Sequence, residues 1–146
     1  MFKKWNEWAP LPLRLVLAVS YTAAGFLKLF TANGYQNFVH ELSHWGVTGA
    51  PANVLTWFVG GLEFASGLLL LVGAYASVVA IVQTLSTIAL LIAITIGGQP
   101  PAYDGLGYFP YVLPDKPYSF AIVAGLLTLL FGGVGKYSVD KLRKSS

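Results

Sequence analysis

The sequence predicts an all-α integral membrane protein, a polytopic bundle of four transmembrane helices formed by residues 1–146 as a single domain. The first observation is compositional: 55% of the 146 residues are hydrophobic and only 10% are charged, whereas soluble domains carry about 25% charged residues. Secondly, four apolar stretches each approach the ~20 residues that cross a hydrocarbon core. Thirdly, none of them shows the strict alternation of apolar and polar residues that is typical of a barrel strand.

The expected spans are four stretches of the chain, of which the last is the shortest: residues 11–30, 54–74, 76–96 and 118–134. In lipid a helix satisfies its own backbone hydrogen-bonding groups, which favours helices over strands. The first stretch follows two lysines, as in a signal peptide, but it is too long for one and is interrupted by Arg14 and Lys28. We therefore interpret it as a retained first span.

The distribution of basic residues predicts the orientation. Lysine and arginine lie at the start of the first span and after the fourth: Lys3, Lys4, Arg14, Lys136, Lys141, Arg143 and Lys144. The connection between the first two spans has neither residue, and the connection before the fourth has only Lys116. Because basic loops stay on the cytoplasmic side, we expect both termini in the cytoplasm.

The two outer connections differ in character. In the first, Phe38, Leu42 and Trp45 recur at the spacing of one helix face. Polar residues occupy the other side of this short helix: Asn37, His40, Glu41 and His44. This pattern predicts an interfacial helix on the outer membrane surface. The second connection, residues 97–117, is rich in proline and tyrosine, which favours an aromatic lid at headgroup depth over a ligand-binding loop.

Three ionisable residues fall within the apolar stretches: Arg14, Lys28 and Glu63. A charge near the centre of a spanning helix costs about 2.5–3.5 kcal/mol or more, so such residues point to function. Arg14 and Lys28 lie near opposite ends of the first span and can extend toward the headgroups. Glu63 lies near the middle of the second span and cannot reach water alone.

Helical spacing gathers the polar and small residues of the first two spans onto one stripe each. The stripe of the first span consists of Arg14, Tyr21, Gly25 and Lys28. That of the second consists of Thr56, Gly60, Glu63 and Gly67. Since small residues allow helices to approach closely in membranes, we expect the two stripes to meet.

The rise per residue places Tyr21 level with Glu63 and Gln83 of the third span close to that level. We therefore expect a midplane cluster of these three residues between the two cations. Two interpretations remain open. Glu63 can be protonated and hydrogen-bonded, serving only to hold the bundle together, or it can belong to a functional pocket.

Residues 40–44 match the zinc motif His-Glu-x-x-His, with His40 and His44 as ligands, Glu41 as base and Glu63 as a formal third ligand. We reject a zinc metallopeptidase because Glu63 is expected at the bilayer centre and the histidines on the surface. The two histidines cannot sandwich a haem within the membrane, and the chain has no others. The absence of cysteine excludes an iron–sulfur cluster and a thiol relay.

Three segments together resemble one family. In the first span Arg14 is followed by Gly25-x-x-Lys28-Leu29, and the second span contains Gly61-x-Glu63 followed by Gly67 and Gly73. The last segment is Gly133-x-Gly135-Lys136-x-Ser138-x-Asp140. In their order and spacing these segments resemble the DoxX family of small membrane proteins. The resemblance implies a four-helix fold in the bacterial plasma membrane. It also implies kinship with DoxD, the membrane subunit of thiosulfate:quinone oxidoreductase.

Two functions follow from the resemblance and the polar stripes. In the first, the chain is a membrane subunit of a quinone-linked oxidoreductase. A partner subunit supplies electrons, Lys28 and Tyr21 donate to a quinone oxygen, and Glu63 transfers the proton. Arg14 and Gln83 complete the candidate ligand-binding residues. In the second, the chain is a non-catalytic bundle that binds a lipid, a hydrophobic metabolite or a partner protein. The expected partners are the lipid bilayer, a redox subunit or a second copy of the chain, and no nucleic acid.

Overall fold

The computed structural model describes residues 8–98, 100, 116–133 and 138–145. The elements that it labels in these ranges are all helices: α2 (Pro10–Phe30), α3 (Ala32–His44), α4 (Ala50–Val72), α5 (Ala76–Gly97), α6 (Lys116–Gly132) and α7 (Val139–Ser145). The all-α prediction is confirmed, and each of the four apolar stretches forms a helix. Helix α4 begins before residue 54, where the apolar stretch starts, because Pro51 in its first turn fixes a helical backbone angle.

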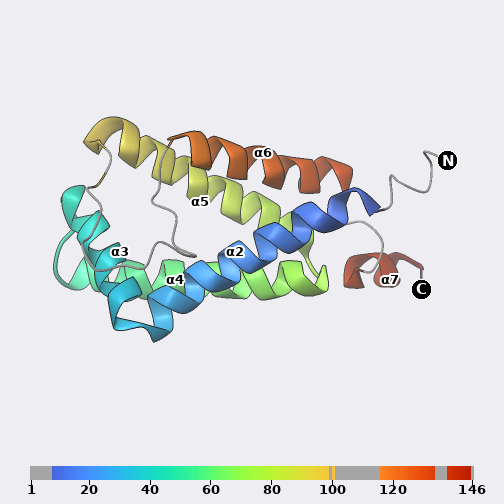
Figure 1. The fold of residues 1–146 in the computed structure, drawn as a ribbon, viewed down its shortest axis with the longest axis horizontal. Coiled ribbons are helices and arrows are strands. Elements are labelled where there is room, and N and C mark those ends of the chain that lie inside the picture. Colours follow the sequence, from blue (N-terminus) through green and yellow to red (C-terminus); the bar gives the residue numbers. More distant parts are fainter. Residues whose placement is uncertain (1–7, 99, 101–115, 134–137, 146) are drawn as a thin grey trace.

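The four long helices run alternately up and down (Figure 1). Helix α2 contacts α4 and α6, and α5 contacts the same two helices, so α4 and α6 lie on diagonally opposite sides of the bundle. The most extensive contact joins α2 to α4, and the next joins α5 to α6. Helix α3 packs on α2 and α4 at one end, called here the α3 end. The opposite end of the bundle, where α7 lies, is called here the α7 end (Figure 1).

Helices α2, α4 and α5 are long and apolar enough to cross a membrane, whereas the apolar part of α6, Ser119–Gly132, is shorter. Large hydrophobic side chains cover the outward faces of these helices, with examples on each in turn: Val16, Phe58, Leu85 and Phe131. A soluble monomer rarely exposes so much apolar surface. In lipid the same surface needs no cover, and the chain is therefore a membrane protein.

Glycines bring the backbones of α2 and α4 into direct contact. A Cβ atom on Gly25 would overlap the backbone nitrogen of Phe64 and would lie 2.6 Å from the carbonyl oxygen of Gly60. A Cβ atom on Gly67 would likewise overlap the backbone of Thr22. The two polar stripes therefore meet as expected, because only hydrogen atoms separate the helices at these positions.

The apolar core occupies the half of the bundle near the α7 end. Its buried members come from all four long helices: Leu17, Ala18, Tyr21, Leu70, Ala76, Val79, Leu126 and Leu129. Seven of these eight side chains have no polar group, so the core itself is held by close apolar packing. The polar residues of the interior lie mainly on the α3 side of this core.

Helix α7 fastens the turn between α4 and α5. The carboxylate of Asp140 accepts hydrogen bonds from the backbone nitrogens of Tyr75 and Ala76, each at 2.9 Å, and so caps the start of α5. The backbone nitrogen of Asp140 donates to Gly73 O at 3.1 Å. Gly73 has a φ of 69°, and a Cβ atom there would meet Arg14 Nη1 and Ser138. The conformation and the space both require glycine.

Helix α3 differs from the expected amphipathic helix. Its polar residues were predicted to face away from the apolar ones, but Asn37 and Glu41 are buried beside Leu42. Of the four polar residues His44 is exposed and His40 is half-buried. The prediction was wrong for Asn37 and Glu41 because α3 covers a polar interior, where the Asn37 amide donates to Glu41 Oε1 at 3.3 Å.

Replacing Gly25 by alanine should destabilise the bundle, because the added methyl group meets backbone atoms of α4 that cannot move independently. Overpacking of this kind costs about 1–3 kcal/mol, and the melting temperature in detergent should fall by several degrees. Gly61→Ala is the matched control, since nothing lies within 4 Å of its added Cβ atom. Equal stability of the two variants would contradict the close packing of α2 on α4.

Candidate functional site

A cavity of about 560 Å³ lies inside the α3 half of the bundle. Helices α2, α3, α4, α5 and α6 all contribute to its walls, which are mostly apolar. The polar residues on the walls are Ser20, Tyr21, Lys28, Glu41, Glu63, Gln83, Ser86, Thr87 and Ser119. A volume of about 300–1,000 Å³ with few polar groups is typical of small-molecule sites.

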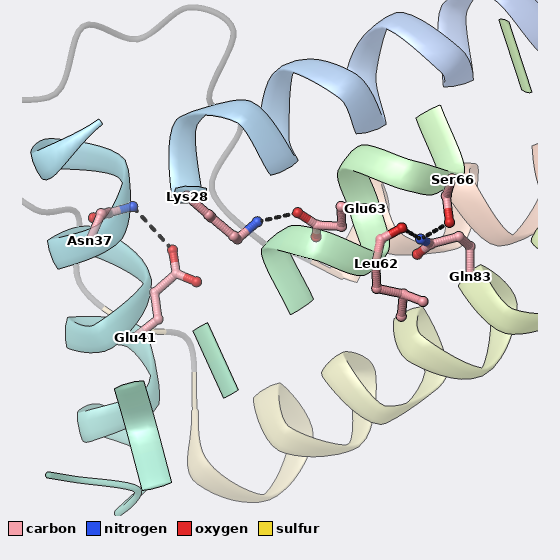
Figure 2. A network of polar contacts seen from close by, with 7 residues as sticks. All are labelled: Lys28, Asn37, Glu41, Leu62, Glu63, Ser66 and Gln83. Carbon is pink, nitrogen blue, oxygen red and sulfur yellow. Dashed lines mark hydrogen bonds and ion pairs between the residues drawn. The ribbon is translucent and has the colours of Figure 1, made fainter. Parts of the chain in front are cut away.

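A buried ion pair spans the junction of α2 and α4 at this cavity. The Lys28 ammonium donates to Glu63 Oε2 at 2.6 Å (Figure 2). The side chains are 6% and 16% exposed, respectively. The Lys28 nitrogen also lies 4.9 Å from the centre of the Phe38 ring on α3, a cation–π contact.

Lys28 therefore does not extend toward the headgroups, and that prediction was wrong. A carboxylate within hydrogen-bonding distance offsets the desolvation of the ammonium inside the bundle. Arg14 is also buried, at 2% exposure, beside Gly73 at the α7 end. It is not part of the cavity wall. Of the candidate ligand-binding residues, the cavity brings together Tyr21, Lys28, Glu63 and Gln83 and leaves Arg14 outside.

Gln83 has a structural partner of its own. Its amide nitrogen donates to Ser66 Oγ at 2.8 Å and lies 3.5 Å from Leu62 O, which ties α5 to α4 (Figure 2). Gln83 is 1% exposed, so both contacts are buried. The expected cluster of Tyr21, Glu63 and Gln83 thus lines one cavity, but the partner of Glu63 is Lys28. Gln83 is hydrogen-bonded to α4 through Ser66 and so holds the α5 wall of the cavity in place.

The zinc motif has a different arrangement from that of a metal site. Glu41 is buried and lines the cavity, whereas His44 is exposed and does not line it. Within the described ranges, no group of three or more His, Cys, Asp or Glu residues could hold a metal ion. The motif therefore contributes its glutamate to the cavity.

Comparison with protein families gives one match. A model of the DoxX family matches residues 9–96, which is more than half of the chain. The chain belongs to the DoxX family. Searches of curated proteins and of solved structures give no significant match.

The DoxX match extends from the start of α2 nearly to the end of α5. It therefore includes the Lys28–Glu63 pair, Gln83 and the α3 residues that line the cavity. Helices α6 and α7 lie beyond it. The wall formed by α6, and the cap that Asp140 provides, are described by the structure alone.

Sequence reasoning missed five polar wall residues of this DoxX-family site: Ser20, Glu41, Ser86, Thr87 and Ser119. It also missed Asn37 and Ser66, which are hydrogen-bonded to the wall residues Glu41 and Gln83. Asn37 and Glu41 were placed on the solvent side, and Ser66 lies one turn from Glu63 on the stripe of α4 but was not considered. Ser119 of α6 lines the cavity and is 1% exposed. The spacing of Glu63, Ser66 and Gly67 could have indicated Ser66, whereas no sequence pattern indicates that Ser119 faces the cavity.

Removing one member of the ion pair should destabilise the protein more than removing both. Lys28→Met leaves the Glu63 carboxylate without its cation, which typically costs about 3–5 kcal/mol in a protein interior. The double variant Lys28→Met/Glu63→Leu leaves no charge and should recover most of this loss. Thermal unfolding in detergent measures both. A double variant as unstable as Lys28→Met alone would mean that the lysine stem, rather than the charge, stabilises the bundle.

Proposed function

We propose that this DoxX-family protein is a membrane subunit of a quinone-linked oxidoreductase complex, and that its cavity holds the quinone headgroup beside Lys28 and Glu63. The observation that carries the proposal is a buried ion pair in the wall of a largely apolar cavity of about 560 Å³. An apolar ring fits such walls, and an ion pair supplies the polar groups that a ring carbonyl and its proton require.

Lys28 is the donor in this proposal. An ammonium has three donor hydrogens, and one of them is used for Glu63. The others are available to a carbonyl oxygen in the cavity. A charge-assisted hydrogen bond is stronger than a neutral one, and the positive charge stabilises the negative charge that develops on the oxygen during reduction. Tyr21 contributes a hydroxyl group to the same cavity.

Glu63 is the proton carrier. Its side chain lies at the cavity wall and is the more exposed member of the pair. The carboxylate can take a proton from solvent and pass it to a reduced quinone oxygen, and two such transfers supply the two protons of the quinol. Reduction also needs electrons, and the chain has no cysteine for an iron–sulfur cluster or a thiol relay. The proposal therefore assigns electron delivery to a partner subunit.

We also infer the placement of the protein in the bacterial plasma membrane. Helix α6 is proposed as the fourth span, because it is apolar and packs antiparallel beside α5 (Figure 1). The basic residues then put both termini, and the α7 end, in the cytoplasm. Helix α3 covers the outer end, and the cavity lies in the outer half of the membrane.

The proposal is tested by identifying what the protein carries. The chain purified from membranes in a mild detergent should release a quinone on solvent extraction, identified by absorbance and mass spectrometry. Lys28→Gln should reduce the bound quinone at least about tenfold, because a hydrogen bond from a charged group is lost. Thr95→Ala, on an exposed part of α5, is the control. Extraction of phospholipid alone, unaffected by Lys28→Gln, would favour the lipid-binding alternative.

Glu63→Gln separates binding from proton transfer. The amide has nearly the same volume and can accept from Lys28, so the variant should fold and bind quinone. It cannot release a proton, so quinone reduction with the native partner should be lost. Glu63→Leu alone would leave the Lys28 ammonium without its carboxylate, so the double variant Lys28→Met/Glu63→Leu is the comparison that should fold and be inactive. Full activity in Glu63→Gln, or aggregation of both variants, would reduce Glu63 to a structural residue.

A further inference from the structure

A fully buried hydroxyl group in the cavity wall is left without a partner. Ser119 is 1% exposed, and within the described part of the chain its Oγ has no hydrogen-bond partner. Buried hydroxyl groups normally have a partner, so a buried one without a partner requires an explanation. Ser119 lies in the first turn of α6 and lines the cavity.

Two other buried hydroxyl groups of the described residues also lack a partner, those of Thr22 and Thr84, but neither residue lines the cavity. Other hydroxyl groups avoid this cost by bonding within their own helix. Four threonines on three helices donate to the carbonyl oxygen four residues earlier, at 2.7–2.8 Å: Thr56, Thr87, Thr95 and Thr128. Such bonds need no external group. The hydroxyl group of Ser119 makes no such bond in the structure and therefore remains available at the cavity wall.

The position of Ser119 relative to the ion pair limits what it can bind. Ser119 belongs to α6 and Glu63 to α4, which are the diagonally opposite helices of the bundle. Both residues lie on the α3 side of the apolar core, since Ser119 is one turn beyond Ile122 and Glu63 two turns beyond Leu70. The cavity thus has the ion pair at the α4 wall and the buried hydroxyl group of Ser119 at the α6 wall. The α2 and α5 walls between them are mixed, with Ser20, Tyr21, Ser86 and Thr87 beside apolar side chains.

We propose that Ser119 is the second polar anchor of the site and donates to the oxygen of the ligand that lies farthest from Lys28. This inference rests on the proposed function and makes it more specific. The ligand is a flat apolar ring that carries a hydrogen-bond acceptor at each end, as a 1,4-quinone does. A ligand with one polar end would leave the hydroxyl group of Ser119 without a partner.

The test compares two probes on the purified full-length protein. 1,4-Naphthoquinone has an acceptor at both ends of the ring, and 1-tetralone keeps the fused-ring frame with one carbonyl. Since the stronger bond comes from Lys28, the single carbonyl should bind there. Ser119→Ala should weaken naphthoquinone binding about 3- to 10-fold, the value of one net hydrogen bond, and leave tetralone binding unchanged.

The controls distinguish this inference from the proposed function. Ser119→Ala should be at least as stable as the wild type, because it removes an unpaired buried hydroxyl group. Ser119→Cys provides a second variant of similar volume with a weak donor. Thr128→Ala, on the same helix with its hydroxyl group exposed, should change neither affinity.

Each outcome bears on one claim. If the wild type binds naphthoquinone and the Ser119 variants bind it equally well, the second anchor is overturned while the quinone site stands. An equal loss for both probes also overturns it, because Ser119 then affects only the shape of the cavity. If the wild type binds neither probe, the proposed function itself fails.

Discussion

The ion pair between Lys28 and Glu63 is the interaction on which the rest of the site depends. Each charge alone would be expensive in an apolar bundle, but at 2.6 Å each offsets the desolvation of the other. The pair needs α2 and α4 to be close, and the glycines at positions 25, 60 and 67 allow that approach. The cavity then opens beside the pair, where α3 replaces lipid as its neighbour. Without the glycines the helices would separate and both charges would lose their partner.

The two halves of the bundle have different roles, one in stability and the other in forming the site. Near the α7 end, apolar side chains from four helices pack closely, and Asp140 fastens the turn between α4 and α5. Near the α3 end, the helices enclose a cavity whose wall includes polar groups from five helices, α2 to α6. Side chains that line an empty cavity lose dispersion contacts, which lowers stability. The closely packed half near the α7 end compensates for this loss. This division lets one small chain hold both a rigid core and a site.

Much of this architecture could be predicted from the sequence, because membrane helices follow simple rules of length and of helix-face spacing. The expected contact between the stripes of α2 and α4 followed from the repeat of small residues. The direction of Lys28 could not be predicted, since a lysine near a helix end can extend outward or inward and only the position of Glu63 decides. The buried positions of Asn37 and Glu41 depend on what α3 covers, and that of Ser119 depends on the rotation of α6 about its axis. The packing of the helices against one another determines these side-chain positions, and no local sequence pattern indicates them.

The central claim is that a quinone binds in the cavity beside Lys28 and Glu63. Photolabelling with an azido-substituted quinone, followed by mass spectrometric mapping of the modified residues, measures this most directly. We predict labels on the cavity walls of α2, α4 and α6, close to Lys28, Glu63 and Ser119, and loss of these labels when excess unlabelled quinone is present. Labels confined to the lipid-facing side chains, such as Phe58 and Leu85, and undiminished by the competitor, would contradict the account.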